Sequence, residues 1–183
     1  AASHPRIWHY RIYDTVSDPE AVIRDWLANN TTPLLDQPYA GRDYVRVQSY
    51  GTAAPVADEM CAQETEPVAH FGDEIELLAG LHSPSPRPGA MLYTSLCLSG
   101  RESEVAPHLR ASLRLYPPGT PDSLPLAQKD VSLPPKLTTR NNNAVRLGLP
   151  VPASLPPGKY RLELILYDGR NGEPLVIDDP RAV

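Results

Sequence analysis

The sequence predicts a mainly β protein in which a short βαβ segment precedes an immunoglobulin-like β-sandwich of two sheets. Three observations lead to this prediction. The 183 residues include 22 prolines, which are excluded from helix interiors and central strands and therefore favour many short elements. Short alternating segments separated by proline- or glycine-bearing turns fill the chain from residue 71 onward. A strand–helix–strand pattern precedes them.

The N-terminal segment alternates in a way that predicts two strands joined by a helix. Residues 6–14 (RIWHYRIYD) alternate apolar with polar side chains and are rich in strand-forming types. Residues 43–50 (DYVRVQSY) repeat the pattern. Such units normally belong to a larger parallel sheet. We therefore expect the segment to pack on the rest of the chain or to be the remnant of a larger α/β domain.

The residues between these strands predict an amphipathic helix. Ser17 and Glu20 have the spacing of a capping box, and Pro19 falls in the first turn, where its missing N–H costs nothing. The apolar residues expected to share one packed face are Val22, Ile23, Trp26 and Leu27. The helix is expected to end near Asn29 and Asn30. Residues 29–32 (NNTT) also form two overlapping glycosylation sequons, although a helix end explains the same residues.

The chain divides into three parts by composition. Residues 1–52 form the βαβ segment, and residues 53–65 lie in a small, acidic and aperiodic stretch that predicts a linker. Residues 66–183 form the predicted sandwich. Its seven strand candidates are 71–83, 90–100, 109–117, 126–134, 144–152, 159–168 and 174–179.

Alternation within two of these strands predicts which side chains face the core. Leu109, Ala111, Leu113 and Leu115 are expected to face inward, opposite to Arg110, Ser112, Arg114 and Tyr116. In the strand at 159–168, the inward set is Tyr160, Leu162, Leu164 and Leu166. The Cys–Trp–Cys pattern of true immunoglobulin domains is absent. Turns are expected on both sides of the strand at 159–168, because residues 155–158 (LPPG) and the pair Asn171-Gly172 are strong turn signals.

Charge and hydropathy exclude several classes of partner. The net charge is −5 and no basic run occurs, so nucleic acid and anionic membrane surfaces are poor partners. No apolar stretch reaches the roughly 20 residues that span a bilayer, and the N-terminus lacks a signal-peptide pattern. The first residues lead almost directly into a strand, which is typical either of the cut edge of a longer protein or of a chain trimmed for expression, and the sequence does not decide between a fragment and a full protein. The sequence carries no pattern that predicts an oligomeric state.

The two cysteines, Cys61 and Cys97, leave two alternatives open. They are too few for a disulfide framework and lack the spacing of metal ligands. A single bridge would form in an oxidising compartment. Cys97 lies in an apolar run, where a free buried thiol is common, so we favour the free thiol.

Candidate metal and catalytic residues each have a simpler structural explanation. Asp168, Asn171 and Glu173 carry the oxygen ligands that calcium prefers, but their spacing does not match an EF-hand and hairpin tips carry the same residues. Asp178 and Asp179 are expected to be a solvated chain end. The scattered histidines are His4, His9, His70, His82 and His108. Without a histidine metal motif, a nucleophile elbow or a phosphate-binding glycine loop, we assign no catalytic, cofactor-binding or metal residue.

Aromatic side chains crowd the N-terminal segment. They are Trp8, Tyr10, Tyr13, Trp26, Tyr39, Tyr44 and Tyr50. Aromatic faces can stack on sugar rings, so a glycan platform is one interpretation. We favour a core role, because Trp8 and Trp26 occupy strand and helix positions that are expected to pack against each other.

Three stretches resemble one family. Residues 6–30, 68–80 and 151–175 are quoted in that order: RIWHYRIYDTVSDPEAVIRDWLANN, VAHFGDEIELLAG and VPASLPPGKYRLELILYDGRNGEPL. The first is similar to a soluble extracytoplasmic stretch of bacterial membrane glycosyltransferases akin to the dolichyl-phosphate-mannose–protein mannosyltransferases. The other two are similar to the C-terminal β-sandwich of many of those proteins.

The resemblance implies a non-enzymatic role for this chain. The family's catalytic acidic residues lie near the start of the whole protein and its lipid-linked donor is held by membrane helices, so no catalytic residue carries over. It implies an accessory domain on the extracytoplasmic face of the membrane that braces the enzyme or positions its acceptor. Its partners would be the membrane-embedded part of the parent protein and a glycan or protein acceptor. The alternative is a freestanding module that binds carbohydrate or protein.

Overall fold

The protein is mainly β, with one helix longer than a single turn among the residues that the structure describes. The computed structural model describes residues 4–41, 45–52, 61, 66–73, 75–83, 86–100, 108–119, 123–134, 137 and 144–178. The chain separates into two compact units, unit 1 (Ala1–Ala54) and unit 2 (Pro55–Val183).

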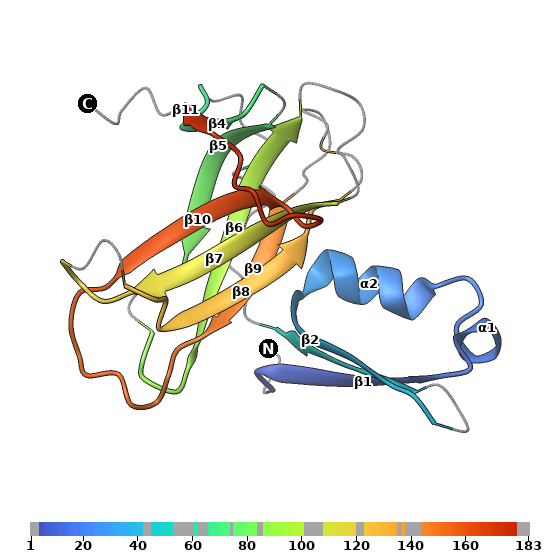
Figure 1. Cartoon of the computed structure of the whole chain (residues 1–183). Helices are drawn as coiled ribbons and strands as arrows, with labels where there is room; N and C mark the ends of the chain where they lie inside the picture. Colours follow the sequence, from blue (N-terminus) through green and yellow to red (C-terminus); the bar gives the residue numbers. More distant parts are fainter. Residues whose placement is uncertain are drawn as a thin grey trace. The chain divides into compact units, whose positions relative to one another are not determined.

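Unit 1 is a three-stranded antiparallel sheet with a helix on one side (Figure 1). Its elements are β1 (Arg6–Ile12), α1 (Asp14–Ser17), α2 (Val22–Asn30), β2 (Thr32–Tyr39) and β3 (Val45–Gly51). The strand order is β1-β3-β2, and β3 pairs antiparallel with both neighbours. The strands that flank the helix therefore run parallel to each other but are separated by β3.

The prediction of a βαβ segment with parallel strands is therefore wrong for the described part of unit 1, where the paired strands are antiparallel. The expectation missed β2, whose Pro33 and Pro38 argue against a central strand. They are tolerated because β2 lies at the sheet edge, where the missing N–H groups break no ladder. The short connection from Tyr39 to Val45 then returns β3 alongside β2, and such a connection permits only antiparallel pairing.

The helix begins later than the sequence predicts. No Ser17–Glu20 capping box forms; Ser17 ends the one-turn α1, where its hydroxyl donates to the carbonyl of Tyr13 at 3.4 Å. The carboxylate of Asp18 instead accepts from the backbone N–H groups of Ile23 and Arg24, at 3.3 and 3.2 Å. An acidic group there satisfies otherwise unpaired donors and complements the helix dipole.

The end of α2 at Asn30 agrees with the prediction. Asn30 donates its side-chain amide to the carbonyl of Trp26 at 2.8 Å. Thr31 follows as the C-cap, and its hydroxyl donates to the carbonyl of Leu27. The threonines of both sequons, Thr31 and Thr32, are buried, so these residues have a structural role as a helix stop.

Unit 2 consists of two antiparallel sheets. One has the order β11-β4-β5-β6-β9 and the other the order β10-β7-β8. The strands are β4 (Ala69–Phe71), β5 (Ile75–His82), β6 (Met91–Gly100), β7 (Leu109–Tyr116), β8 (Ala127–Ser132), β9 (Ala144–Pro150), β10 (Arg161–Asp168) and β11 (Ile177–Asp178). A single cluster of buried aliphatic side chains draws on both sheets, which is the packing of a β-sandwich.

The inward rows that alternation predicts are confirmed. The core row of β7 is fully buried: Leu109, Ala111, Leu113 and Leu115 are each at most 6% exposed. Leu166 on β10 is also fully buried, and Tyr160, Leu162 and Leu164 pack against the same cluster. Direct pairing of Leu166 with Ala111 and of Leu164 with Leu113 puts the two rows on one face.

The outer face of β7 is more buried than alternation predicts. Ser112 and Tyr116 are buried although they point away from the core. Arg114 donates from Nε to the hydroxyl of Ser112 at 3.0 Å, and the Arg161 guanidinium lies 4.8 Å from the centroid of the Tyr116 ring. Long arginine side chains thus cover this face while their charged ends stay near water.

The expectation of a free thiol at Cys97 is wrong. Cys61 and Cys97 form a disulfide with a Cα–Cα distance of 5.3 Å, within the range that such bonds require. Cys97 lies on β6, where its register partners are Ala79 and Ala144. The partners are 36 residues apart, a proximity that depends on tertiary structure and that no local pattern reveals.

Candidate functional site

The tip of the loop after β10 gathers the polar residues that the sequence singled out for calcium. Tyr167 and Pro174 form an antiparallel bridge, and the N–H of Asp168 donates to the carbonyl of Glu173 at 2.9 Å. Gly172 has φ +78° while Asn171 does not adopt a positive φ. The predicted hairpin therefore closes with a longer loop than a two-residue Asn-Gly turn.

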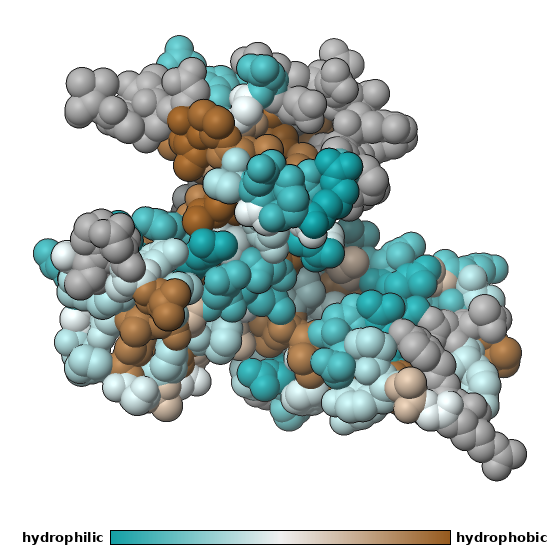
Figure 2. All heavy atoms as spheres, viewed as in Figure 1, coloured by the Kyte–Doolittle hydropathy of each residue, from teal (hydrophilic) through white to brown (hydrophobic). Residues whose placement is uncertain are grey.

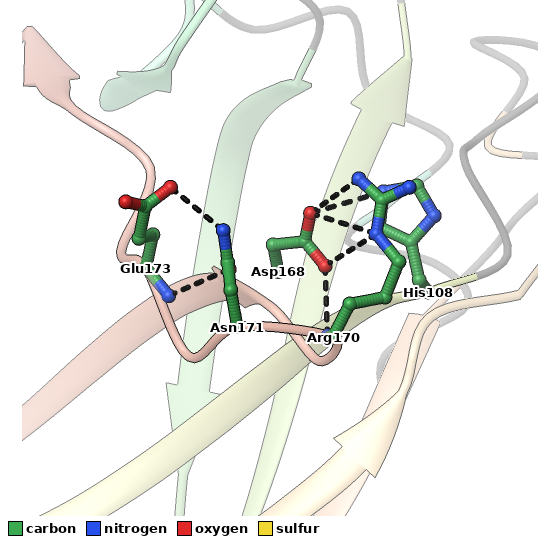
Figure 3. Close-up of polar contacts among 5 residues, drawn as sticks. All are labelled: His108, Asp168, Arg170, Asn171 and Glu173. Carbon is green, nitrogen blue, oxygen red and sulfur yellow. Dashed lines mark hydrogen bonds and ion pairs between the residues drawn. The ribbon is translucent and has the colours of Figure 1, made fainter.

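Protein cations and amides satisfy the carboxylates at this tip (Figure 3). Arg170 contacts both oxygens of Asp168, with Nη2 to Oδ2 at 2.6 Å, and the Nε2 atom of His108 lies 3.4 Å from Oδ2. Asn171 donates to Glu173 Oε2 at 2.7 Å and accepts from the N–H of Glu173 at 3.0 Å. The calcium interpretation therefore gains no support, because these oxygens face donors of the protein itself.

The same loop transfers the chain from one sheet to the other. Leu175 donates its N–H to the carbonyl of Leu166 on β10, at 2.8 Å. One residue later, the carbonyl of Val176 accepts from Gly72 at 2.7 Å, and β11 then pairs with β4. The network around Asp168 holds the loop that precedes this change of sheets. Its evident role is structural.

This network makes a prediction for acid stability. The hydrogen bonds from Arg170 lower the pKa of Asp168 to about 2. A carboxyl whose pKa is lower in the folded than in the unfolded state stabilises the fold above its unfolded pKa, and the stabilisation disappears as pH falls toward the folded value. We expect Asp168→Asn to lower the melting temperature at pH 7, with the difference from wild type closing between about pH 4 and pH 2.

Thermal unfolding at stepped pH measures this effect. Asp73→Asn, in the exposed turn between β4 and β5, is the control for removing one surface carboxylate. A difference between wild type and Asp168→Asn that stays constant from pH 7 to pH 2 would contradict the role given to the carboxylate.

The histidines lie apart from one another and contact different groups, and the Nδ1 atom of His9 is buried without a hydrogen-bond partner. His70 and Glu76 are register partners on β4 and β5, with Nδ1 3.6 Å from Oε1. His82 contacts the carbonyl of Ser83 at 3.0 Å. Within the described ranges, no group of three or more histidine, cysteine or acidic residues has the arrangement of a metal site. Asp178 lies in β11, and Asp179 lies outside the described residues.

The sheet of unit 1 has one predominantly apolar face. Register places its apolar side chains in three rows across β1, β3 and β2, because residues directly opposite in a sheet share a face. A further row at the end of the sheet pairs Arg6 with Gly51, and the Arg6 guanidinium lies 5.8 Å from the centroid of the Trp8 ring. The three apolar rows are Trp8–Ser49–Leu35, Tyr10–Val47–Gln37 and Ile12–Val45–Tyr39. We call these nine residues the apolar sheet face.

The opposite face is polar and lies under the helix. It carries Asp36, Arg46, Gln48 and Tyr50, and Asp36 accepts from Arg46 Nη2 at 2.8 Å and from Gln48 at 3.1 Å. Although partial burial opposes the shift, these hydrogen bonds lower the pKa of Asp36. Burial raises the pKa of Tyr50, while the charge of Arg24 on α2 counters the rise. Along β1, the side chains on this polar face are partly buried, whereas those on the apolar side are exposed. The helix α2 therefore lies over the polar face (Figure 1).

The apolar sheet face is therefore open to solvent. Trp8 is 49% exposed and Tyr10 is 64% exposed, and the other large exposed members are Ile12, Leu35 and Tyr39. On the outside of α2, Trp26 is 55% exposed, together with Val22 and Ile23. The expectation that Trp8 and Trp26 form a core is wrong. The prediction that Val22, Ile23, Trp26 and Leu27 form one packed helix face is also wrong, because only Leu27 is buried.

The alternation of β1 contained the signal for this face. Trp8, Tyr10 and Ile12 share one side of the strand, and His9 and Arg11 lie on the other. Alternation in one strand does not show which side of the sheet a helix covers. Among the remaining aromatic residues, Tyr13 is exposed, Tyr50 is buried and Tyr44 lies outside the described residues.

Unit 2 has a smaller apolar patch near its last strand. Figure 2 shows hydrophobic atoms gathered over the end of the unit where β11 lies, and the exposed side chains of this segment include Val176 and Ile177. β11 is an edge strand. It spans only two residues, which limits the edge that another strand could pair with.

Comparisons with known proteins leave the family open. No family model matches the chain, no curated protein matches it, and no solved structure matches it. Among the described residues, no helix has the length and apolar character needed to cross a bilayer.

Proposed function

We propose that this chain is a non-catalytic accessory portion of a membrane-bound glycosyltransferase, located on the extracytoplasmic side, in which unit 1 docks on the membrane-embedded part of the parent protein. The observation that carries the proposal is the apolar sheet face. A helix normally covers the apolar side of a sheet, but the burial pattern of β1 puts α2 over the polar side (Figure 1). The apolar side needs a different cover.

The size of the exposed surface supports docking. A buried aromatic side chain removes about 150–250 Å² from water, and the five large members of the apolar sheet face are 39–64% exposed. Together they present on the order of 500 Å² of apolar surface. The largest apolar patch on a soluble domain is commonly of about this size and is often functional. Such a surface braces a partner and performs no chemistry itself.

Two further features support the compartment and the architecture. The Cys61–Cys97 disulfide suits an oxidising, extracytoplasmic environment. In unit 2, strands β5, β6 and β9 lie in one sheet and β8, β7 and β10 in the other. This order supports an immunoglobulin-like sandwich of the kind appended to extracellular proteins. The resemblance of residues 6–30 and 151–175 supports the glycosyltransferase assignment.

Association with the parent protein tests the proposal. The chain, carrying an affinity tag, is mixed with detergent-solubilised membranes containing the rest of the parent protein, and the retained fraction gives an apparent Kd. We expect Tyr10→Lys to weaken retention by about 30-fold, the effect of removing one interface anchor worth roughly 2 kcal/mol. Tyr10 is 64% exposed, so the variant keeps its fold.

The matched control is Leu124→Lys, which puts the same charge on an apolar residue that is 87% exposed in unit 2. Equal retention of both variants and wild type would reject docking through unit 1. Sugar transfer by the purified chain alone would reject a non-catalytic role. A parent reading frame without membrane-spanning helices would reject the glycosyltransferase assignment.

The aromatic content of the same face favours one alternative, a carbohydrate-binding module. Trp8, Tyr10 and Tyr39 are all about half exposed or more on one side of the sheet, and flat aromatic rings stack on sugars. A glycan array followed by tryptophan fluorescence titration distinguishes the two functions. Micromolar quenching by a sugar, lost in Trp8→Ala, would favour the binding module over the docking role.

A further inference from the structure

A second candidate site lies at the open end of the sandwich in unit 2. A hollow of about 510 Å³ opens between the two sheets there, a volume within the range of small-molecule sites. Leu92 and Val151 line it from the β6–β9 side, and Leu115 and Leu162 line it from β7 and β10. Figure 1 shows the orange loop that precedes β10, whose residues 155–158 line the hollow, at the end of unit 2 opposite to β11.

The segment 155–158 (LPPG) walls the hollow as well as forming a turn. Tyr160 donates its hydroxyl to the carbonyl of Pro156 at 2.7 Å, which pins the loop. Val151 and Ala90 are joined by a 2.9 Å backbone hydrogen bond, which ties the facing loop to the same end. The prolines and these bonds hold the walls in place, so a ligand would find a largely formed site.

The polar groups at the mouth of the hollow are basic. His82 and Arg87 are exposed lining residues, and no acidic residue is among the described residues that line it. A neighbouring hollow of about 400 Å³ is lined by the same segment, and Lys159 is the charged residue among its described lining. No described carboxylate pairs with Arg87 or Lys159. Arg87 and Lys159 thus put two positive charges beside the same segment, in a chain whose net charge is −5.

We propose that this end of the sandwich binds an anionic amphiphile, with a single aliphatic chain in the hollow and its acidic head group at Arg87. Branched aliphatic walls favour a flexible hydrocarbon chain, and the basic rim selects a carboxylate or phosphate head over a neutral or cationic one. The site lies in unit 2 and uses none of the residues of the apolar sheet face. It therefore stands or fails independently of the docking role of unit 1.

Isothermal titration of the chain with twelve-carbon amphiphiles, below their micelle concentrations, tests the proposal. We expect dodecanoate and dodecyl phosphate to bind, and the tighter of the two identifies the head group. Each methylene removed is expected to weaken binding about fourfold, so decanoate binds roughly 15-fold more weakly than dodecanoate. Dodecyl maltoside and dodecyltrimethylammonium are expected to bind at least about fivefold more weakly, because they lack the ion pair with Arg87.

Two variants locate the site. Arg87→Glu is expected to abolish the preference for anionic heads, whereas Arg24→Glu makes the same charge change on α2 of unit 1 and leaves binding unchanged. Leu155→Trp is expected to fill the hollow and reduce affinity for every chain. Thermal unfolding verifies that each variant is folded.

Three results would overturn the proposal. They are the absence of binding by either anionic amphiphile, an affinity for the cationic amphiphile equal to that for dodecanoate, and an Arg87→Glu variant that keeps its preference for anions.

Discussion

Reduction of the Cys61–Cys97 disulfide is expected to lower the free energy of unfolding of unit 2 by about 4 kcal/mol. The two cysteines are 36 residues apart, and the loss of chain entropy on closing a loop of that length corresponds to about 4 kcal/mol at 25 °C. The bond restricts the unfolded chain, which then has less entropy to lose on folding. The whole free energy of unfolding of a small domain is only about 5–15 kcal/mol, so the loss is a large fraction of it. Among the changes considered, this one has the largest expected effect.

Urea unfolding with and without a thiol reductant measures the effect. A Cys61→Ala/Cys97→Ala double variant should unfold near the reduced wild type and should not respond to reductant. Coincident unfolding curves of the oxidised and reduced wild type would show that the bond contributes little. A large effect would also support the extracytoplasmic proposal, since the chain would lose much of its stability in a reducing compartment.

Leu166→Ala is expected to lower the free energy of unfolding by about 3 kcal/mol. Leu166 is fully buried on β10 and belongs to the core cluster shared by the two sheets. Removing three side-chain carbons loses their burial and leaves a cavity that rigid sheets cannot close completely. The change acts on the contact between the layers of unit 2 and leaves the loop network at Asp168 in place.

Leu124→Ala is the matched control for the core variant. The same atoms are removed, but Leu124 is 87% exposed, so the expected change is within about 0.5 kcal/mol. Urea midpoints of the two variants, measured with an unchanged m-value, give the comparison directly. Similar losses in both variants would contradict the assignment of Leu166 to the central core.

The sequence predicted the residues of the two candidate surfaces only in part, and it did not predict their positions. Aromatic residues in β1 and the LPPG segment stood out by composition, and the sequence predicted a core and a turn for them. Their positions on an open face and at the wall of a hollow depend on partners distant in the chain. Trp8, for instance, shares a row with Ser49 and Leu35, and the LPPG segment faces Leu92 and Leu115.

The sequence by itself determined the features that depend on neighbouring residues. Alternation specified the inward row of β7 and the burial of Leu166, and the run of asparagines and threonines specified the end of α2 at Asn30. These predictions hold because side-chain direction in a strand and the end of a helix depend on residues only a few positions apart.

Tertiary structure decided the features that depend on distant residues. Only the antiparallel insertion of β3 turned a predicted parallel unit into an open apolar face, and only the packing of the two sheets brought Cys61 to Cys97. Which side of a sheet a helix covers, and which loops meet at the end of a sandwich, follow from contacts across tens of residues. Such contacts are chosen by the burial of the whole surface and not by local propensity.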